Sequence, residues 1–144
     1  MQLVRIYTDG ACTKNPGGRG GWAFIIEGLG ERIERCGSHP STTNNRMELT
    51  AAIEGLKALP TAPLIVTVVS DSQYVVKGAS VWSKNWIRKG RLGENTLLAN
   101  VDLWRELLAL AERHRVTWEW VRGHNGHPQN ERCDQLAEGQ AAKR

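Results

Sequence analysis

The sequence predicts an α/β fold in which helices flank a five-stranded mixed sheet. Three short segments with strand-like patterns lie within residues 3–37 and are separated only by turns, as expected for an antiparallel meander. A nearly continuous apolar run at 64–69 is typical of a strand buried on both faces of a sheet. Helical patterns lie on both sides of that run, so we expect parallel strands joined by helices to complete the sheet.

The meander begins with a segment rich in β-branched and aromatic residues that ends at Asp9. The turn sequence NPGG at 15–18 precedes the second strand, and a glycine-containing turn at 28–30 precedes the third. Short connections of this kind pair consecutive strands in antiparallel fashion. The expected strands are 3–8, 22–27 and 32–37.

Helices and strands alternate in the rest of the chain. The first helix follows a run of residues that favour the N-cap position and is stopped by Pro60. Asn100 is a candidate cap for a later helix, and Pro128 suits the first position of the last one. The expected helices are 46–59, 72–79, 101–114 and one that begins at 128, and the expected strands are 64–69 and 116–121.

Composition excludes several classes of protein. The 144 residues, 40% of them hydrophobic, correspond to one domain that spans 1–144 and has a real core. No apolar run approaches the ~20 residues that a membrane-spanning helix needs. Arg5 and Asp9 interrupt the N-terminus too early for a secretory signal, and the 3 cysteines form no close pair. We therefore expect a cytoplasmic monomer that does not bind membranes.

Four acidic residues are placed where they can form a site. Asp9 and Asp71 follow expected strands, and they would lie side by side if those strands are parallel neighbours. Glu48 lies in the first turn of the expected first helix and Asp134 in the last helix. Converging carboxylates repel unless a hard cation such as Mg²⁺ binds them. Individually, each acid also fits a turn, a cap or a helix dipole, so the residues alone indicate only a candidate metal site.

The segment 77–91 is basic and carries no acidic residue. Trp82 and Trp86 are four residues apart and share a face if the segment is helical. Cations interleaved with aromatic rings suit a nucleic acid backbone and its bases. The alternative is a solvated helix whose two tryptophans pack in the core. Both interpretations can hold at once, with one ring binding nucleic acid and the other packing in the core.

The loop at 123–127 contains His124, whose side chain could shuttle a proton to a leaving group. His124, His127 and Cys133 do not match the spacing of a common zinc finger. The glycines after the first strand form no Walker loop, so nucleoside triphosphate binding is unsupported.

Several longer motifs occur in one order along nearly the whole chain. They are TDG at 8–10, TTNNRMEL at 42–49, SDSQYV at 70–75, NVDLW at 100–104 and WVRGHNGHPQNERCDQLA at 120–137. In these motifs the chain resembles bacterial ribonuclease H of type 1. The resemblance implies a ribonuclease H-like fold and an endonuclease that cuts the RNA strand of RNA–DNA hybrids, leaving 5′-phosphate and 3′-hydroxyl ends.

The resemblance also implies roles for the acidic residues. Asp9, Glu48, Asp71 and Asp134 fall on the family's metal-binding positions, where two Mg²⁺ ions, or Mn²⁺ as a substitute, would act in phosphodiester hydrolysis. His124 falls on the loop histidine that helps the product to leave.

The resemblance also implies substrate contacts. The residues that fall where the family meets the hybrid's minor groove are Asn15, Asn44, Asn45 and Gln73. The residues that fall near the family's DNA-strand contacts are Thr43, Asn100 and Trp86, and Trp82 belongs to the basic protrusion at 77–91. Contact with ribose 2′-hydroxyls would distinguish RNA from DNA, and little sequence preference is expected.

The chain departs from its apparent relatives in two places. Residues 92–99 contain Glu94 and neither Lys nor Arg, where relatives are often lysine-rich, so weaker hybrid affinity is expected. No separate N-terminal hybrid-binding domain is expected, and processivity should be low. A DNA nuclease or integrase of the same fold fits the complete motif set less well. A hybrid-binding module without catalysis would have no need to keep four repelling acids.

Overall fold

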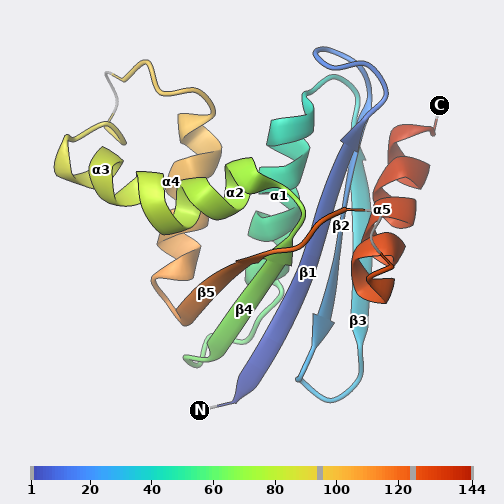
Figure 1. Ribbon diagram of the computed structural model, residues 1–144, viewed down its shortest axis with the longest axis horizontal. Coiled ribbons are helices and arrows are strands. Elements are labelled where there is room, and N and C mark those ends of the chain that lie inside the picture. Colours follow the sequence, from blue (N-terminus) through green and yellow to red (C-terminus); the bar gives the residue numbers. More distant parts are fainter. Residues whose placement is uncertain (1, 94–95, 124–125, 144) are drawn as a thin grey trace.

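The five strands form one mixed sheet in the order β3-β2-β1-β4-β5 (Figure 1). The computed structural model describes residues 2–93, 96–123 and 126–143. Strand β1 pairs with β2 and β2 with β3 in antiparallel fashion, whereas β4 is parallel to both β1 and β5. The predicted meander followed by parallel strands is therefore confirmed. The strands are β1 (Leu3–Cys12), β2 (Gly20–Glu27), β3 (Ile33–His39), β4 (Ile65–Ser70) and β5 (Arg115–Trp120).

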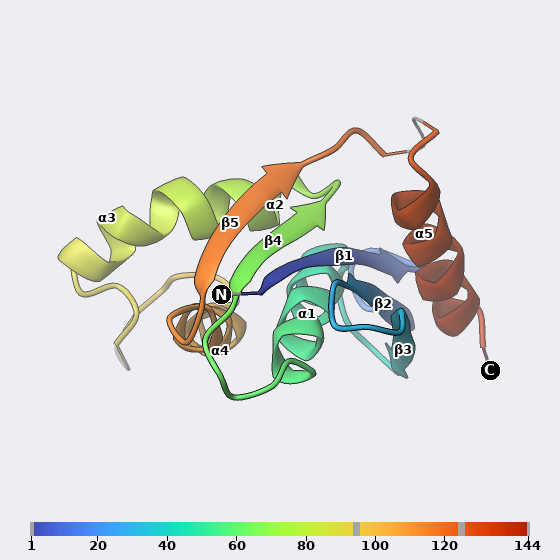
Figure 2. The same ribbon diagram turned by 90° about the horizontal axis from the view of Figure 1, so that it is seen from below.

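Helices cover both faces of the sheet, but unequally (Figure 2). α1 (Asn44–Lys57) and α4 (Val101–Ala111) lie on one face, and α5 (Pro128–Ala141) lies on the other, against β1, β2 and β3. The larger core fills the α1 and α4 side and includes Phe24 and Trp104. A smaller core joins α5 to the opposite face through Cys133 and Ala137. Burial in this second core raises the pKa of the Cys133 thiol, which keeps it protonated.

Side-chain caps determine where three helices begin. Thr43 Oγ1 accepts a hydrogen bond from the Arg46 amide at 3.2 Å, so α1 begins at Asn44, two residues earlier than predicted. Ser72 caps α2 (Gln73–Lys77) in the same way, and His127 Nδ1 accepts from the Asn130 amide ahead of α5.

The chain between α2 and α4 differs from the predicted single helix at 72–79. α2 continues into a π-helical turn, η1 (Gly78–Trp82), and then into α3 (Ser83–Arg88). At Gly78 any Cβ would overlap with the indole of Trp104, so this close packing requires glycine. The same segment carries Trp86 into the core and leaves Trp82 39% exposed.

Two further boundaries were predicted wrongly. β1 does not stop before Asp9 but continues to Cys12, because β2 pairs with it as far as Cys12 opposite Gly20. α4 ends at Ala111 instead of 114, and His114 Nδ1 accepts a hydrogen bond from the Leu64 amide at the start of the parallel strands. No helix in the described part of the chain is both long and apolar enough to cross a membrane.

Candidate active site

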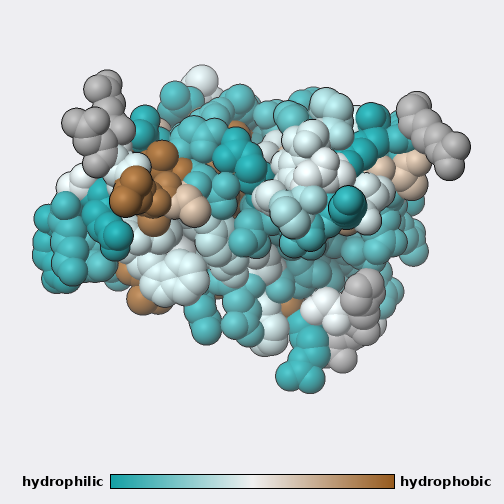
Figure 3. Space-filling view, turned by 90° about the horizontal axis from the view of Figure 1, so that it is seen from above, coloured by the Kyte–Doolittle hydropathy of each residue, from teal (hydrophilic) through white to brown (hydrophobic). Residues whose placement is uncertain are grey.

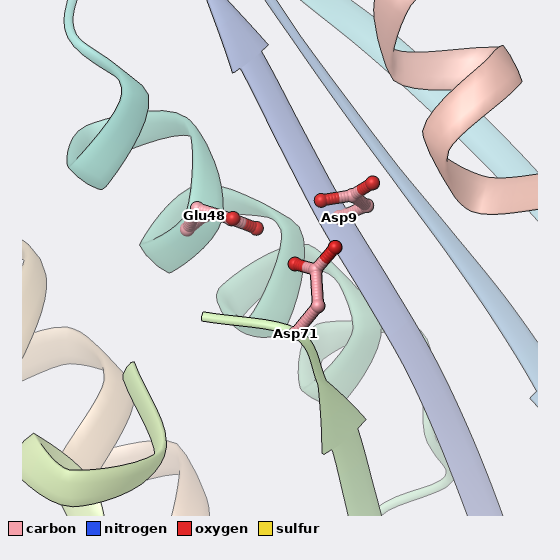
Figure 4. A group of neighbouring side chains, drawn as sticks. All are labelled: Asp9, Glu48 and Asp71. Atoms are coloured by element: carbon pink, nitrogen blue, oxygen red, sulfur yellow. The ribbon is translucent and has the colours of Figure 1, made fainter. Parts of the chain in front are cut away.

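Three carboxylates converge beyond the end of the parallel β1–β4 ladder (Figure 4). The last pair in that ladder is Thr8 opposite Ser70, so Asp9 and Asp71 are the next residues on neighbouring strands. Glu48 reaches them from α1, and one carboxylate oxygen of each acid lies within 4.8 Å of those of the others. The predicted neighbourhood of Asp9 and Asp71 is confirmed by this register.

Glu48 does not occupy the first turn of its helix, contrary to the prediction. Because α1 begins at Asn44, Glu48 lies in the second turn, and the first turn holds no acidic residue. A favourable interaction with the helix dipole therefore does not explain this acid. Its carboxylate instead points toward Asp9 and Asp71 (Figure 4).

Gly10 allows α1 to approach β1 closely enough for Glu48 to reach the other acids. A Cβ at this position would overlap with the backbone at Met47 and Glu48. We expect Gly10→Ala to push α1 away, to lower stability by about 1–3 kcal/mol and to lower severely the hybrid cleavage that the sequence resemblance implies. Thermal unfolding and turnover of the purified variant would check this. Gly139→Ala, which adds a methyl group where nothing lies nearby, is the matched control. Full activity of Gly10→Ala would contradict the argument.

Asp134 approaches the cluster from α5, on the opposite face of the sheet. Its carboxyl interacts with Asp9 by hydrogen bonding and by charge, and both effects raise the pKa of Asp9. Its position depends on Gly21 of β2, where a Cβ would overlap with the α5 backbone at Ala137. Asp134 is not one of the three acids within mutual reach, so the structure places it beside Asp9 and not at the centre of the group.

The electrostatics of the cluster are those of a site that lacks a positive charge. Burial, followed by the negative charges of Glu48 and Asp71, raises the pKa of Asp9 to about 11. Burial and the charge of Asp71 also raise the pKa of Glu48 well above its usual value. Asp9 Oδ2 and Glu48 Oε1 are buried and find no hydrogen-bond donor among the described residues. Neighbouring carboxylate oxygens that repel each other and have no hydrogen-bond donors are suitable ligands for a hard divalent cation.

The amide side chains predicted to contact the hybrid lie near this end of the sheet. The backbone N–H of Asn44 donates to the side-chain Oδ1 of Asn15 at 3.2 Å, which holds the β1–β2 loop against the start of α1. Asn45 is exposed in the first turn of α1, and Gln73 is exposed at the start of α2, two residues after Asp71. Their contact with nucleic acid remains a prediction.

The predicted DNA-strand residues form a second group. Arg46 connects the start of α1, where Thr43 lies, to Asn100 at the start of α4. Trp82 is partly exposed and therefore accessible to a ligand. Trp86 is 7% exposed and packs against Trp104, with the two ring centroids 5.0 Å apart. This agrees with the alternative that one ring packs in the core. His124 lies outside the described residues.

Sequence reasoning missed Arg46 and Tyr74, although both lie inside motifs that were noticed. Arg46 forms an ion pair with Asp102 at 2.7 Å and also donates to Asn100. Tyr74 Oη accepts hydrogen bonds from Asn100 and Trp104. No local pattern identifies such residues, because their partners lie far away in the sequence.

The surface seen from above Figure 1 is mostly hydrophilic (Figure 3). Apolar atoms gather toward the α3 side of this view, away from the end of α5. The exposed large apolar residues in the described chain between α2 and α4 are Val81, Trp82, Ile87 and Leu97.

Comparison with known proteins identifies the family. The family model described as RNase H matches residues 1–142. The chain is 54% identical to the Ribonuclease H of Cupriavidus necator over 139 residues, which covers 95% of this chain and 94% of that protein. It is also 54% identical to the Ribonuclease H of Lachnoclostridium phytofermentans, with 93% of this chain and 89% of that protein covered.

Solved structures give the same result. The crystal structure of LC9-RNase H1, a type 1 RNase H with the type 2 active-site motif, superposes with a TM-score of 0.85 at 35% identity, covering 98% of this chain and 72% of that chain. The Prototype Foamy Virus protease-reverse transcriptase superposes with a TM-score of 0.83 at 20% identity, covering 100% of this chain and 21% of that chain, and supports the fold alone. The chain therefore belongs to the RNase H family of nucleases.

Proposed function

We propose that the protein hydrolyses the RNA strand of RNA–DNA hybrids at the cluster of Asp9, Glu48 and Asp71, with Asp134 as a fourth acidic residue. The observation that carries this proposal is the convergence of three carboxylates within 4.8 Å. Two of them have strongly raised pKa values and a buried oxygen that meets no donor in the described part of the chain. Such a cluster destabilises the fold unless a cation balances it, and family membership supplies the reaction class.

The four acids are the residues that would hold two divalent ions, Mg²⁺ or in its place Mn²⁺. The chemistry that such ions supply is activation of water and stabilisation of the negative charge that develops on the scissile phosphate and the 3′-oxygen. Asp9 interacts with each of the other three acids, so it is the carboxylate common to the α1 and α5 sides of the cluster. The expected products carry 5′-phosphate and 3′-hydroxyl ends, and His124 keeps its predicted role in product release.

The protein's own polar groups would select and orient the hybrid. The Asn15 side chain accepts a hydrogen bond from the Asn44 backbone N–H, so these two exposed residues are held next to each other at this end of the sheet. Side-chain amides of this kind can form hydrogen bonds with ribose 2′-hydroxyls in the minor groove of a hybrid. Duplex DNA has no 2′-hydroxyls and cannot form these hydrogen bonds. Thr43 and Asn100, joined through Arg46, would contact the DNA strand, and duplex RNA would fit poorly there.

Cleavage of four labelled substrates tests the proposal: an RNA–DNA hybrid, single-stranded RNA, duplex RNA and duplex DNA, each with Mg²⁺ and with a chelator. We expect only the RNA strand of the hybrid to be cut, and only with the metal present. Asp71→Asn should remove cleavage, whereas Glu138→Gln, an exposed acid on α5, should not. Tight hybrid binding without cutting would instead identify a binding module, and cutting of duplex DNA would identify a different nuclease.

A further inference from the structure

Asn100 has a backbone conformation that costs stability. With φ 59° and ψ 27°, it is the one residue other than glycine with a positive φ in the described part of the chain. The left-handed region costs roughly 1–2 kcal/mol for most residues and somewhat less for asparagine. Asn100 also occupies the N-cap of α4, yet its side chain makes no capping hydrogen bond. The amide group is therefore held for another purpose.

Both ends of the Asn100 amide have partners. Arg46 Nη1 donates to Asn100 Oδ1 at 3.2 Å, and Asn100 Nδ2 donates to Tyr74 Oη at 3.0 Å. Trp104 Nε1 donates to the same hydroxyl oxygen at 3.0 Å. Arginine and tryptophan can only donate, so the oxygen of the amide must face Arg46 and its nitrogen must face Tyr74.

The two partners are themselves fixed. Asp102 accepts two hydrogen bonds from the Arg46 guanidinium, at 3.0 and 2.7 Å, and this contact lowers the pKa of Asp102. The Tyr74 ring packs edge-on against Trp104, with centroids 5.4 Å apart, and the Trp104 side chain is fully buried. A continuous chain of hydrogen bonds thus joins the core to the partly exposed Asn100.

We infer that Tyr74 and Arg46 are positioning residues that fix the orientation of the Asn100 amide for contact with a phosphate of the DNA strand. In this orientation one N–H of Asn100 bonds to Tyr74 and the second stays available to a phosphate oxygen. The opposite orientation would present a carbonyl oxygen to the phosphate and repel it. This inference rests on the proposed function, since it assigns the groups that orient one of its substrate contacts.

The hydrogen-bond chain should affect binding of the hybrid more than turnover, since none of its members is an acid of the metal cluster. Tyr74→Phe keeps the ring contacts and removes only the hydroxyl that accepts from Asn100. We expect it to raise KM for the hybrid about 3- to 10-fold, the effect of one hydrogen bond, with kcat unchanged within about 2-fold.

A double-mutant cycle separates positioning from general stability. Asn100→Gly removes the amide and keeps the left-handed backbone without strain. In that background Tyr74→Phe should raise KM by less than about 1.5-fold, because no amide remains to be oriented. Arg46→Lys tests the hydrogen bond to the oxygen end of the same amide. Its effect on KM should likewise be smaller in the Asn100→Gly background.

Tyr7→Phe is the matched control. Its hydroxyl accepts from Arg5 Nε at 3.1 Å on the other face of the sheet, and its loss should leave KM and kcat in place. Equal effects of Tyr74→Phe in both backgrounds, or an unchanged KM, would overturn the inference. Failure of the wild-type protein to cut the hybrid would overturn the proposed function instead. Thermal unfolding of each variant, and anisotropy of a labelled hybrid with chelator present, would separate misfolding from lost contact.

Discussion

Asp9→Asn is expected to abolish hybrid cleavage and, at the same time, to make the metal-free protein more stable. This substitution removes the carboxylate that interacts with every other acid of the cluster, by hydrogen bonding or by charge. We expect activity to fall by about 1,000-fold or more, since charge stabilisation in such a site amounts to several kcal/mol. Merely structural acids do not combine these two effects.

The gain in stability follows from the direction of the pKa shift. The pKa of Asp9 is about 11 in the folded protein, compared with an ordinary value of 3.8 for an aspartate in the unfolded chain. Between pH 3.8 and about 11, the folded state therefore binds the Asp9 proton more tightly than the unfolded state does. The contribution of Asp9 to the stability of the metal-free wild type is therefore lost progressively as pH rises from about 4 toward about 11. Asparagine carries no charge at any of these pH values and escapes this penalty.

Thermal unfolding in chelator at pH 5, 7 and 9 measures this effect. The melting temperature of Asp9→Asn should exceed that of the wild type at pH 7 by about 3 °C or more, a free-energy gain of about 1 kcal/mol, and the difference should widen at pH 9. Added Mg²⁺ should stabilise the wild type more than the variant. Glu138→Gln should behave like the wild type. A lower melting temperature for Asp9→Asn at pH 9 would show that the cluster is not under electrostatic strain.

Local sequence patterns predicted the strands and helices because each signal acts over a few residues. The continuous apolar run became β4, and the parallel neighbours β1 and β4 placed Asp9 beside Asp71 as expected. The end of β1 was missed because it depends on a partner: β2 pairs beyond Asp9. The start of α1 was missed by two residues because several adjacent residues were equally good caps, and only the structure shows that Thr43 is the one used.

The candidate site needed more than local patterns. The residues of the acidic cluster came from their places after strands and in helices, but their convergence depends on glycines that let helices approach the sheet, at Gly10 and Gly21. The orientation of Asn100 depends on Arg46 and Tyr74, which are remote in sequence. Interactions between distant residues leave no periodic signal, so the sequence indicated which residues matter and not how they are held.

The two tryptophans of the basic protrusion show the same limit and lead to opposite predictions. Their spacing of four residues suggested a shared face, yet a π-helical turn precedes α3 and the two rings differ in environment. Trp86 belongs to the main core together with Trp104 and is 7% exposed. Trp82 is 39% exposed and meets Trp86 at a centroid distance of 6.3 Å. Trp86 is thus part of the core, whereas the Trp82 ring is accessible from solvent.

We therefore expect Trp86→Ala to lower the free energy of unfolding by about 3–5 kcal/mol, because it empties a well-packed core position. Trp82→Ala should cost much less stability but raise KM for the hybrid about 5-fold or more, the effect of losing a ring on which sugars or bases stack. Urea unfolding measures the first effect and steady-state kinetics at several hybrid concentrations the second. Trp82→Phe should restore most of the affinity, since it keeps an aromatic face. If Trp86→Ala instead kept its stability and raised KM, Trp86 would contact the hybrid directly and the protrusion would have to open when the hybrid binds.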